Sequence, residues 1–318
     1  MMGMEAGEAS AVTSIAVRDE RVYWVEHAAP YDELEGGSRK PRGSLRVAPL
    51  APPPRPRNDP TPPFGKRITT FTGAAQLALD DKHAFLAIHD DDRGGKAPSG
   101  AIMRVPLAGG QQRMLVPFAD APQSLVLDGD HVYWVDAEGL GKVSKSGGKP
   151  TRIANVKGSR IAIDDTTIWV LERARVAKVA KADGTVTALG VTFIEEAGLA
   201  IDGDFVYGAT WMGDAGKSFT SIVKVPKSGG APIVLVRDQT YPRELTVDET
   251  HVFWINGLVG REAELRRVGK DGQGAEVMLT HEVLTTIASA PNVMVCASSE
   301  RMENGQRTGT GVLLRIAK

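Results

Sequence analysis

The sequence predicts an all-β fold, a single seven-bladed β-propeller of four-stranded blades that occupies residues 1–318. Three observations support this prediction. A short phrase built around an aspartate recurs along the chain, a second phrase follows each copy after a variable gap, and helical hydrophobic patterning is nearly absent. Equivalent aspartates lie 36 to 61 residues apart, a period that suits a blade of four antiparallel strands.

The first phrase predicts the two inner strands of each blade and the turn between them. Its copies are SIAVRDERVYWVE from Ser14, QLALDDKHAFLAI from Gln76, SLVLDGDHVYWVD from Ser124, RIAIDDTTIWVLE from Arg160, GLAIDGDFVYGAT from Gly198, ELTVDETHVFWIN from Glu244 and a degenerate TTIASAPNVMVCA from Thr285. An aspartate after a strand accepts hydrogen bonds from the next backbone amides. We therefore interpret the repeated aspartates as turn formers and not as catalytic groups.

The second phrase predicts the third and fourth strands. Its copies are SLRVAPLAP, AIMRVPLAGGQQRML, LGKVSKSGGKPTRIA, VAKVAKADGTVTAL, SIVKVPKSGGAPIVL, ELRRVGKDGQGAEVML and VLLRIAK. The glycine pairs inside it, such as Gly147-Gly148, fall where a hairpin turn needs positive φ. No helix is expected after them, so they are not phosphate-binding loops.

The weak seventh copy leaves six blades as an alternative. The last copy stops inside its third strand, so a closing strand from within residues 1–12 is expected, with a three-stranded last blade as the other solution. Residues 51–66 are proline-rich and predict a surface loop in polyproline II conformation. Its PPPRP stretch resembles an SH3-type ligand, and a stiff loop without a partner is the alternative.

The overall composition limits the classes of partner that the chain is expected to bind. With 38 basic and 39 acidic residues there is no global field for nucleic acid or a membrane surface, and we expect neither. The single cysteine, Cys296, excludes an internal disulfide and a multi-cysteine zinc site. Neither a signal sequence nor a membrane span is recognisable, so the chain is expected to be soluble and cytoplasmic as it stands, and periplasmic or secreted if a signal peptide has been lost.

Histidines and aromatic pairs also follow the repeat. His83, His131 and His251 share one position at the start of the second strand, so a propeller holds them apart and they form no metal triad. Tyr133-Trp134 and its equivalents place aromatic rings on both faces of the second strand, where they are expected to fill the space between blades.

In VYWVD from Val132 and VYWVE from Val22 the chain resembles the YWTD class of propeller repeats, and with its glycine-pair turn it is similar to uncharacterised bacterial YWTD/DUF5050-like propellers. The resemblance covers the repeats but consists of structural residues. Val135 replaces the threonine of the motif, and the second, fourth, fifth and seventh copies lack the Tyr-Trp pair. The resemblance implies the propeller fold and a tendency to bind proteins, and it transfers no catalytic residue.

Specific chemistry is expected where the repeats differ. Insertions between the second and third strands begin at His27, His89, Thr210, Asn256 and Ser298, and strand alternation puts them all on one face. This face is the predicted partner-binding surface, with Tyr31 as a candidate contact and Trp211-Met212 as an exposed apolar anchor in a glycine-rich loop.

The same face should carry the mouth of the central channel. The predicted ring of residues there includes Gln76, Arg160 and Glu244, with Tyr241 and Arg243 just before Glu244. An acid and a base at a polar mouth could orient a small ligand, and solvated rim residues are the plainer interpretation.

Asp90, Asp91 and Asp92 form the densest acidic run, a candidate site for Ca²⁺, but they lack the alternating spacing of a calcium loop. We therefore expect no metal site and no cofactor.

Three functions remain in competition. The first is a non-catalytic scaffold, expected to be a monomer, that binds a protein partner through the insertion-bearing face. The second is a hydrolase or lyase at the channel mouth, with Glu244 as acid–base and Arg160 as anion stabiliser. The third is carbohydrate binding, for which the candidate aromatics are Tyr31, Trp211, Phe219 and Tyr241.

Overall fold

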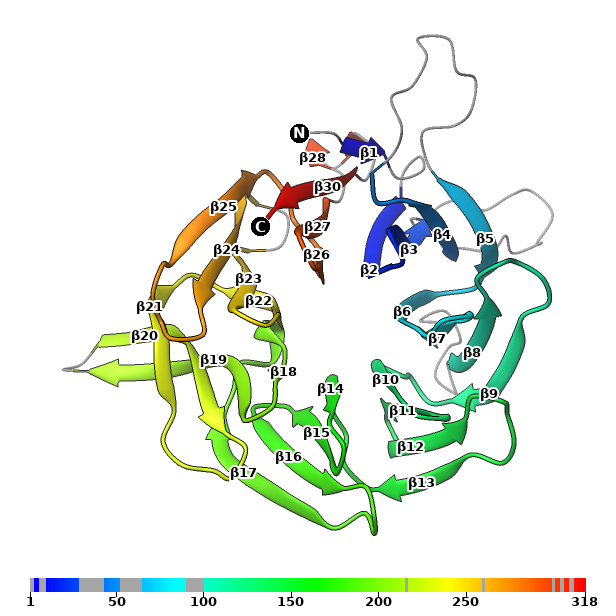
Figure 1. Cartoon of the computed structure of the whole chain (residues 1–318), viewed down its shortest axis with the longest axis horizontal. Coiled ribbons are helices and arrows are strands. Elements are labelled where there is room, and N and C mark those ends of the chain that lie inside the picture. The colour runs from blue at the N-terminus through cyan, green and yellow to red at the C-terminus, as the bar shows by residue number, and fades with distance from the viewer. Residues whose placement is uncertain are drawn as a thin grey trace.

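The computed structural model describes residues 3–5, 10–28, 43–51, 65–89, 100–214, 217–258, 261–298, 301–303, 306–308 and 312–318. Seven four-stranded antiparallel sheets stand around a common axis as the blades of a β-propeller (Figure 1). The predicted fold and its count of seven blades are confirmed, and the six-blade alternative is wrong because the degenerate copy from Thr285 builds a complete sheet. In the described part of the chain the only helix is the 3₁₀ turn η1 (Glu195–Ala197).

The first four blades follow one another along the chain. Blade one contains β2 (Ser10–Arg18), β3 (Arg21–Ala28), β4 (Gly43–Pro49) and β5 (Lys66–Phe71). Blade two contains β6 (Ala74–Leu79), β7 (His83–His89), β8 (Gly100–Pro106) and β9 (Arg113–Ala119). Blade three contains β10 (Ser124–Asp128), β11 (His131–Asp136), β12 (Gly139–Ser144) and β13 (Thr151–Ala154). Blade four contains β14 (Arg160–Ile163), β15 (Thr167–Glu172), β16 (Arg175–Ala180) and β17 (Val186–Thr192).

The last three blades complete the ring. Blade five contains β18 (Ala200–Ile201), β19 (Phe205–Asp214), β20 (Lys217–Pro226) and β21 (Ile233–Gln239). Blade six contains β22 (Pro242–Val247), β23 (His251–Asn256), β24 (Ala263–Gly269) and β25 (Glu276–His281). Blade seven contains β26 (Thr286–Ala290), β27 (Val293–Ser298), β30 (Val312–Ala317) and β1 (Gly3–Glu5), and a separate hairpin joins β28 (Arg301–Glu303) to β29 (Gln306–Thr308).

Ring closure uses the two ends of the chain. Strand β1 pairs antiparallel with β30, with Met4 opposite Leu313, and so supplies the outermost strand of blade seven. The chain termini therefore meet at one blade (Figure 1). This arrangement covers an edge that β30 would otherwise leave unpaired.

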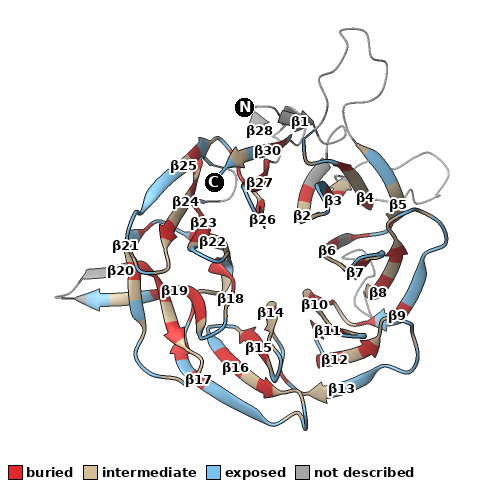
Figure 2. Cartoon of the chain, in the orientation of Figure 1, coloured by how far each residue is buried: buried red, intermediate tan, exposed pale blue. Residues whose placement is uncertain are grey.

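Apolar packing lies between the blades, and the second strands provide the largest share of the buried residues (Figure 2). Tyr133 packs in a cluster with Ile161 and Val170 of blade four, whereas its neighbour Trp134 packs with Phe85 and Ile102 of blade two. Successive residues of a strand point to opposite faces, so one Tyr-Trp pair joins a blade to both of its neighbours. The predicted packing role of these pairs is confirmed.

Four of the six repeated aspartates make the predicted turn hydrogen bonds, whereas the turns at Asp19 and Asp128 contain residues with positive φ. Oδ1 of Asp164 accepts hydrogen bonds from the backbone amides of Thr166 and Thr167, at 3.1 and 2.8 Å. The same pair of bonds occurs at Asp80, Asp202 and Asp248. The glycine pairs also have the predicted positive φ, for example 94° at Gly147 and 130° at Gly148.

The second carboxylate oxygen of these aspartates binds a lysine of the next blade. Lys227 Nζ lies 2.8 Å from Asp164 Oδ2, and Lys270 Nζ lies 2.9 Å from Asp202 Oδ2. The full set of pairs, which we call latches, is Lys145–Asp80, Lys181–Asp128, Lys227–Asp164, Lys270–Asp202 and Lys318–Asp248. Most of these lysines also lie over an aromatic ring of the preceding blade's second strand, as Lys318 does over Phe253 at 5.1 Å.

Blade one has no latch on either side. The positions equivalent to the latch lysines are Leu50 in blade one and Leu107 in blade two, as shown by their identical backbone hydrogen bonds to the turn before the second strand. Blade seven correspondingly has Ala290 in place of the repeated aspartate, so Leu50 faces no buried charge. Both leucines pack against the apolar clusters at their junctions. Between blades one and two, Arg18 holds the position of the repeated aspartate and pairs with Asp81 of blade two, so the latch is replaced there by an apolar contact and an ion pair of another kind.

In the described part of the chain, no helix has the length and apolar character needed to cross a bilayer.

Candidate functional site

The two faces of the ring are built from different connections. Because every blade is antiparallel, the turns after first and third strands lie on one face, which also carries the latches and which we call the latch face. The connections between second and third strands, and the links between blades, lie on the opposite face, here called the insertion face. Repeated residues therefore gather on the latch face and unique residues on the insertion face.

The most distinctive insertion belongs to blade five. Strands β19 and β20 each run for 10 residues, and their hairpin projects beyond the side of the ring (Figure 1). The sequence predicted a glycine-rich loop here, which is wrong, because Thr210 to Asp214 pair residue by residue with Lys217 to Ser221. The β-branched and aromatic residues in TWM and SFT suit a strand and outweigh the loop signal of the glycines.

Strand pairing separates Trp211 from Met212. The Trp211 side chain is 63% exposed, whereas Met212 is partly buried and packs against the core cluster between blades four and five. The prediction that the pair is exposed is therefore correct for Trp211 and wrong for Met212. The reason is the alternation of side chains along a strand, which places neighbours on opposite faces.

Trp211 lines a pocket of about 710 Å³ on the insertion face between blades five and six, here called the interblade pocket. Its wall includes two other aromatic rings, Phe219 and Tyr241, so the structure brings together three of the four aromatics proposed for ligand binding. Leu258 and Ile194 add aliphatic surface. The remaining lining residues are Glu196, Thr220, Asp238, Gln239, Thr240, Pro242, Arg243 and Gly257.

Hydrogen bonds involving buried residues hold the segment that carries Tyr241 in place. Buried Gln239 accepts hydrogen bonds from Trp254 Nε1 at 3.1 Å and Arg266 Nη1 at 3.0 Å, and its own amide donates to the carbonyl of Arg237. The amide of Thr240 donates to Asn256 Oδ1 at 3.0 Å. These bonds fix the turn while the Tyr241 ring remains 59% exposed.

Arg243 forms the base of the pocket and is not an exposed contact. Its guanidinium is buried and donates to the carbonyls of Gly257 at 3.0 Å and Leu284 at 2.6 Å, which ties blade six to the link entering blade seven. Burial lowers the pKa of Arg243, although the neighbouring Glu244 opposes that shift. The predicted site residue thus lies at the site, where it positions the backbone around Tyr241.

Three of the seven described non-glycine residues with positive φ lie at or beside the pocket. Asp238, Tyr241 and Glu244 have φ values of 59°, 52° and 53°, a left-handed conformation that is uncommon for residues other than glycine. Strand β22 also has an irregular register between Arg243 and Thr246. Such conformations persist only where the surroundings impose them, and they are frequent at binding sites.

Arg160 and Glu244 meet at the inner rim of the ring. Arg160 Nη2 of blade four lies 2.9 Å from Glu244 Oε1 of blade six, and Thr286 Oγ1 of blade seven donates to Glu244 Oε2 at 3.0 Å. The equivalent residue of the intervening blade is Gly198, which has no side chain to separate them. Both carboxylate oxygens are thus engaged by neighbouring blades, an arrangement that favours a structural bridge over a free acid–base pair.

The other predicted site residues lie elsewhere. Gln76 is on β6 of blade two, away from the interblade pocket. Tyr31, the acidic run Asp90, Asp91 and Asp92, and residues 52–64 of the proline-rich segment lie outside the described residues. Among the residues that are described, no group of three His, Cys, Asp or Glu side chains is arranged to hold a metal ion.

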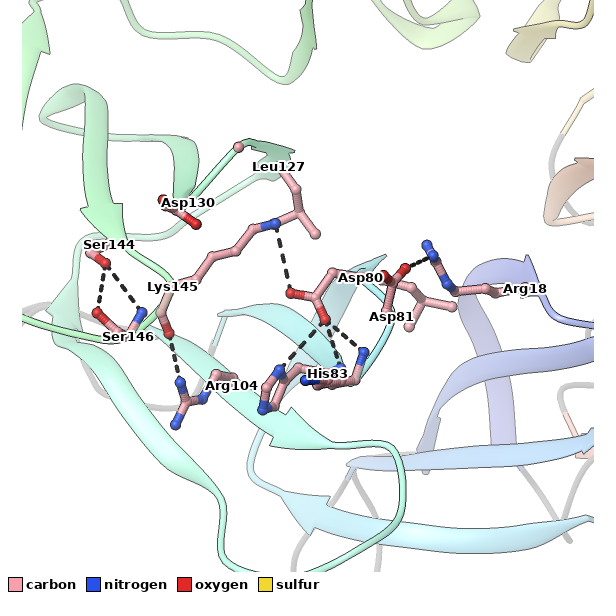
Figure 3. A pocket seen from close by; sticks show the side chains of 13 residues that line it. Arg18, Asp80, Asp81, His83, Arg104, Leu127, Asp130, Ser144, Lys145 and Ser146 are labelled. Carbon is pink, nitrogen blue, oxygen red and sulfur yellow. Dashed lines mark hydrogen bonds and ion pairs between the residues drawn. The ribbon is translucent and has the colours of Figure 1, made fainter.

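A larger hollow, of about 830 Å³, lies on the latch face between blades two and three (Figure 3). Several of its charged residues are engaged. Lys145 lies 3.6 Å from Asp80, Arg104 donates to the carbonyl of Lys145 at 2.8 Å, and Arg18 pairs with Asp81. The hollow therefore contains the latch between blades two and three, and most of its charge is used within the ring.

Buried Cys296 is not a reactive group. It is fully enclosed in the core between blades six and seven, and burial raises the pKa of its thiol to about 12. A thiol that remains protonated at neutral pH is a poor nucleophile.

Several residues of importance were not recognised from the sequence. The latch lysines were visible as the final lysine of KVSK, KVAK, KVPK, RVGK and RIAK, but only the structure shows that each reaches the previous blade. Glu196 lies in the 3₁₀ turn η1 between blades four and five, and Asp238 lies near the end of β21 in blade five, where no repeat pattern marks them. Their position before a first strand was the available signal.

Comparison with known proteins gives similarity of fold. No protein-family model matches the sequence, and no curated protein matches it. The chain is similar to a structure of a nidogen/laminin complex, with 19% identity, a TM-score of 0.50, and coverage of 67% of this chain and 90% of that one.

Two further structures are similar over nearly the whole chain. The computationally designed Ika8 protein is 12% identical, with a TM-score of 0.57 and coverage of 97% of this chain and 98% of that one. PorZ, a surface component of the type-IX secretion system of Porphyromonas gingivalis, is 12% identical with a TM-score of 0.57, and the alignment covers 99% of this chain and 39% of that one. At these identities the likeness concerns the fold alone, and function must be argued from the residues of the site.

Proposed function

We propose that this propeller is a binding protein that recognises a protein partner through its insertion face, with the interblade pocket as the anchor point. One observation carries the proposal. Trp211, on a projecting hairpin, and Tyr241, on a strained and braced turn, are both more than half exposed and line the same pocket. Exposed Trp and Tyr beside a preformed pocket are the residue types that dominate protein interfaces.

Two other considerations support a binding function. Most repeated residues are used to hold the blades together, which leaves the insertion face as the source of specificity. The resemblance of the repeats to the YWTD and DUF5050-like propellers also suggests protein binding, as does the nidogen/laminin complex among the similar structures. Because the Glu244 carboxylate is engaged by Arg160 and Thr286, an enzyme at the channel mouth is less well supported.

Affinity capture from the native host tests the proposal. Wild-type protein, Trp211→Ala and Phe118→Ala are used as baits, the last because Phe118 is an equally exposed aromatic, at 70%, on the outer strand of blade two. We expect the same protein to be enriched by the wild type and by Phe118→Ala, and recovery to fall at least about tenfold with Trp211→Ala. Capture that does not depend on Trp211 would contradict the proposal.

Carbohydrate binding is a second candidate, because Trp211, Phe219 and Tyr241 line one pocket together with polar side chains. Aromatic rings offer flat apolar faces, and Asp238 and Thr240 offer hydrogen-bonding groups. Titration calorimetry with a panel of neutral oligosaccharides tests this function, because its signal does not depend on Trp211. Saturable binding that Trp211→Ala abolishes would favour it over a protein partner.

A further inference from the structure

We propose that the interblade pocket accepts an arginine side chain from the partner, so that the ligand is a peptide segment with an arginine beside an apolar residue. This inference rests on the proposed protein-binding function and specifies the chemistry of the anchor. It follows from the charges, the aromatic rings and the existing cation contacts of the pocket.

The pocket carries negative charge that the described structure does not neutralise. Glu196 and Asp238 are both exposed at its lining, and among the described residues neither carboxylate has a cationic partner. This differs from the latch face, where carboxylates such as Asp164 and Asp202 each hold a lysine. Two unpaired carboxylates beside apolar surface favour a ligand that is both cationic and apolar.

Arg243, the one basic residue of the lining, does not neutralise the carboxylates of Glu196 and Asp238 at the surface. Arg243 is buried, and its donors point to the backbone carbonyls of Gly257, Leu284 and Thr285. Its guanidinium therefore serves the junction between blades six and seven and leaves the two carboxylates available to a ligand.

The aromatic rings of the pocket suit a guanidinium. Arg237 already lies over the Phe219 ring, with its guanidinium carbon 5.3 Å from the ring centroid. Arginine stacks on aromatic faces and pairs with carboxylates through the same planar group, and its methylene stem can lie along apolar surface. Trp211 and Tyr241 offer two further exposed rings at the same lining.

The rings of Trp211 and Tyr241 differ from the aromatic rings of the latch face in the contacts that they make with cations. On the latch face, the rings of Trp169, Tyr207 and Phe253 are each covered by a lysine of the next blade. Within the described residues, no basic side chain covers Trp211 or Tyr241. The partner's arginine would complete on the insertion face the contact that the protein makes for itself on the latch face.

A matched pair of synthetic peptides tests the inference on the full chain. The probes are acetyl-Gly-Leu-Arg-Leu-Gly-amide and the same peptide with citrulline, a neutral isostere of arginine. Trp211 is the one exposed tryptophan, since Trp24, Trp134, Trp169 and Trp254 are each 1% exposed. Protection of fluorescence from acrylamide therefore reports occupancy of the pocket, and calorimetry gives the affinity of variants.

We expect the arginine peptide to protect Trp211 and to bind at least about fivefold more tightly than the citrulline peptide. The charge-neutral variant Glu196→Gln/Asp238→Asn should remove that preference, and Tyr241→Ala should weaken binding while Phe118→Ala does not. Equal binding of the two peptides, no binding of either, or an unchanged preference in the charge-neutral variant would overturn the inference.

The same variants separate this inference from the proposed function. If capture of the partner depends on Trp211 but is unchanged in Glu196→Gln/Asp238→Asn, the protein-binding function stands and the arginine anchor is wrong. If capture does not depend on Trp211, both are wrong.

Discussion

The latch face and the insertion face are built from the same seven blades but use their polar residues differently. On the latch face, aspartates such as Asp164 bind two backbone amides and the lysine of the next blade. On the insertion face, the carboxylates of Glu196 and Asp238 and the rings of Trp211 and Tyr241 face solvent. Residues that repeat are engaged within the ring, whereas the residues available to a ligand occur once.

Removal of a latch aspartate should have the largest effect on stability. Asp164→Ala leaves Lys227 unpaired at 17% side-chain exposure and removes the acceptor for Trp169 Nε1. We expect the free energy of unfolding to fall by about 2–4 kcal/mol, measured by chemical denaturation.

The control for that variant is Asp19→Asn. Asp19 lies in the corresponding turn of blade one, one residue after Arg18, which holds the latch position there; the Asp19 side chain is 79% exposed, and asparagine tolerates its φ of 47°. A change within about 0.5 kcal/mol is expected. Equal losses at Asp19 and Asp164 would show that the turn, and not the lysine, is what stabilises the ring.

The pH dependence of stability provides a second test. Burial alone would raise the pKa of Asp202, but hydrogen bonds from Tyr207 and Lys270 outweigh it and lower the pKa to about 2; Asp248 is lowered to about 2 by Lys318 and two amides. A carboxyl whose pKa is depressed in the folded state stabilises the fold above its unfolded pKa. That contribution, about 2 kcal/mol for each group, should be lost as the pH falls from about 4 through 2.

Urea denaturation between pH 2 and pH 6 measures this effect. Asp248→Asn should be less stable than the wild type at pH 6 and should lose less stability on acidification. An identical slope in the two proteins would contradict the contribution assigned to this latch.

The bridge at the inner rim should have a smaller effect. Arg160 and Glu244 are partly exposed, with side-chain exposures of 34% and 27%, so solvent weakens their attraction. In a double-mutant cycle of Glu244→Gln and Arg160→Met, we expect a coupling of about 0.5–1 kcal/mol. Coupling near zero would show that the two side chains do not hold blades four and six together.

The smallest effect is expected where a latch is added. Arg18→Asp combined with Leu107→Lys places an aspartate and a lysine at the two latch positions between blades one and two, but it also removes the Arg18–Asp81 ion pair and the apolar contacts of Leu107, so the net effect on stability should be close to zero. Coupling between the two substitutions should be up to about 1 kcal/mol in favour of the new pair. A larger coupling would show that exposure does not limit the strength of a latch.

The sequence predicts the fold well because its signals are local and repeated. Asp164 and Gly147 mark turns, and Tyr133 and Trp134 mark a buried strand, without reference to distant residues. The degenerate seventh copy was harder, because Ala290 replaces the aspartate that identifies the others, and the pairing of β26 and β27 then depends on apolar residues alone.

The site was predicted only in part, for a physical reason. Trp211 and Tyr241 are 30 residues apart, one on the hairpin of blade five and the other in the link to blade six, so their meeting depends on the packing of blade five on blade six. Met212 was misassigned because a long hairpin replaces the expected loop, and the pairing of Trp211 with Thr220 decides which side chain faces out. Contacts between blades depend on the tertiary structure, and local sequence patterns do not predict them.

The most direct test of the central claim is site-specific photo-crosslinking in the native host, with p-benzoylphenylalanine placed at position 211 or at position 118. Both positions carry exposed aromatic residues, at 63% and 70%, but only position 211 lines the interblade pocket. We expect one discrete protein adduct from position 211, lost in combination with Tyr241→Ala, and no such adduct from position 118. The same adducts from both positions, or none from position 211, would contradict binding of a protein partner at this pocket.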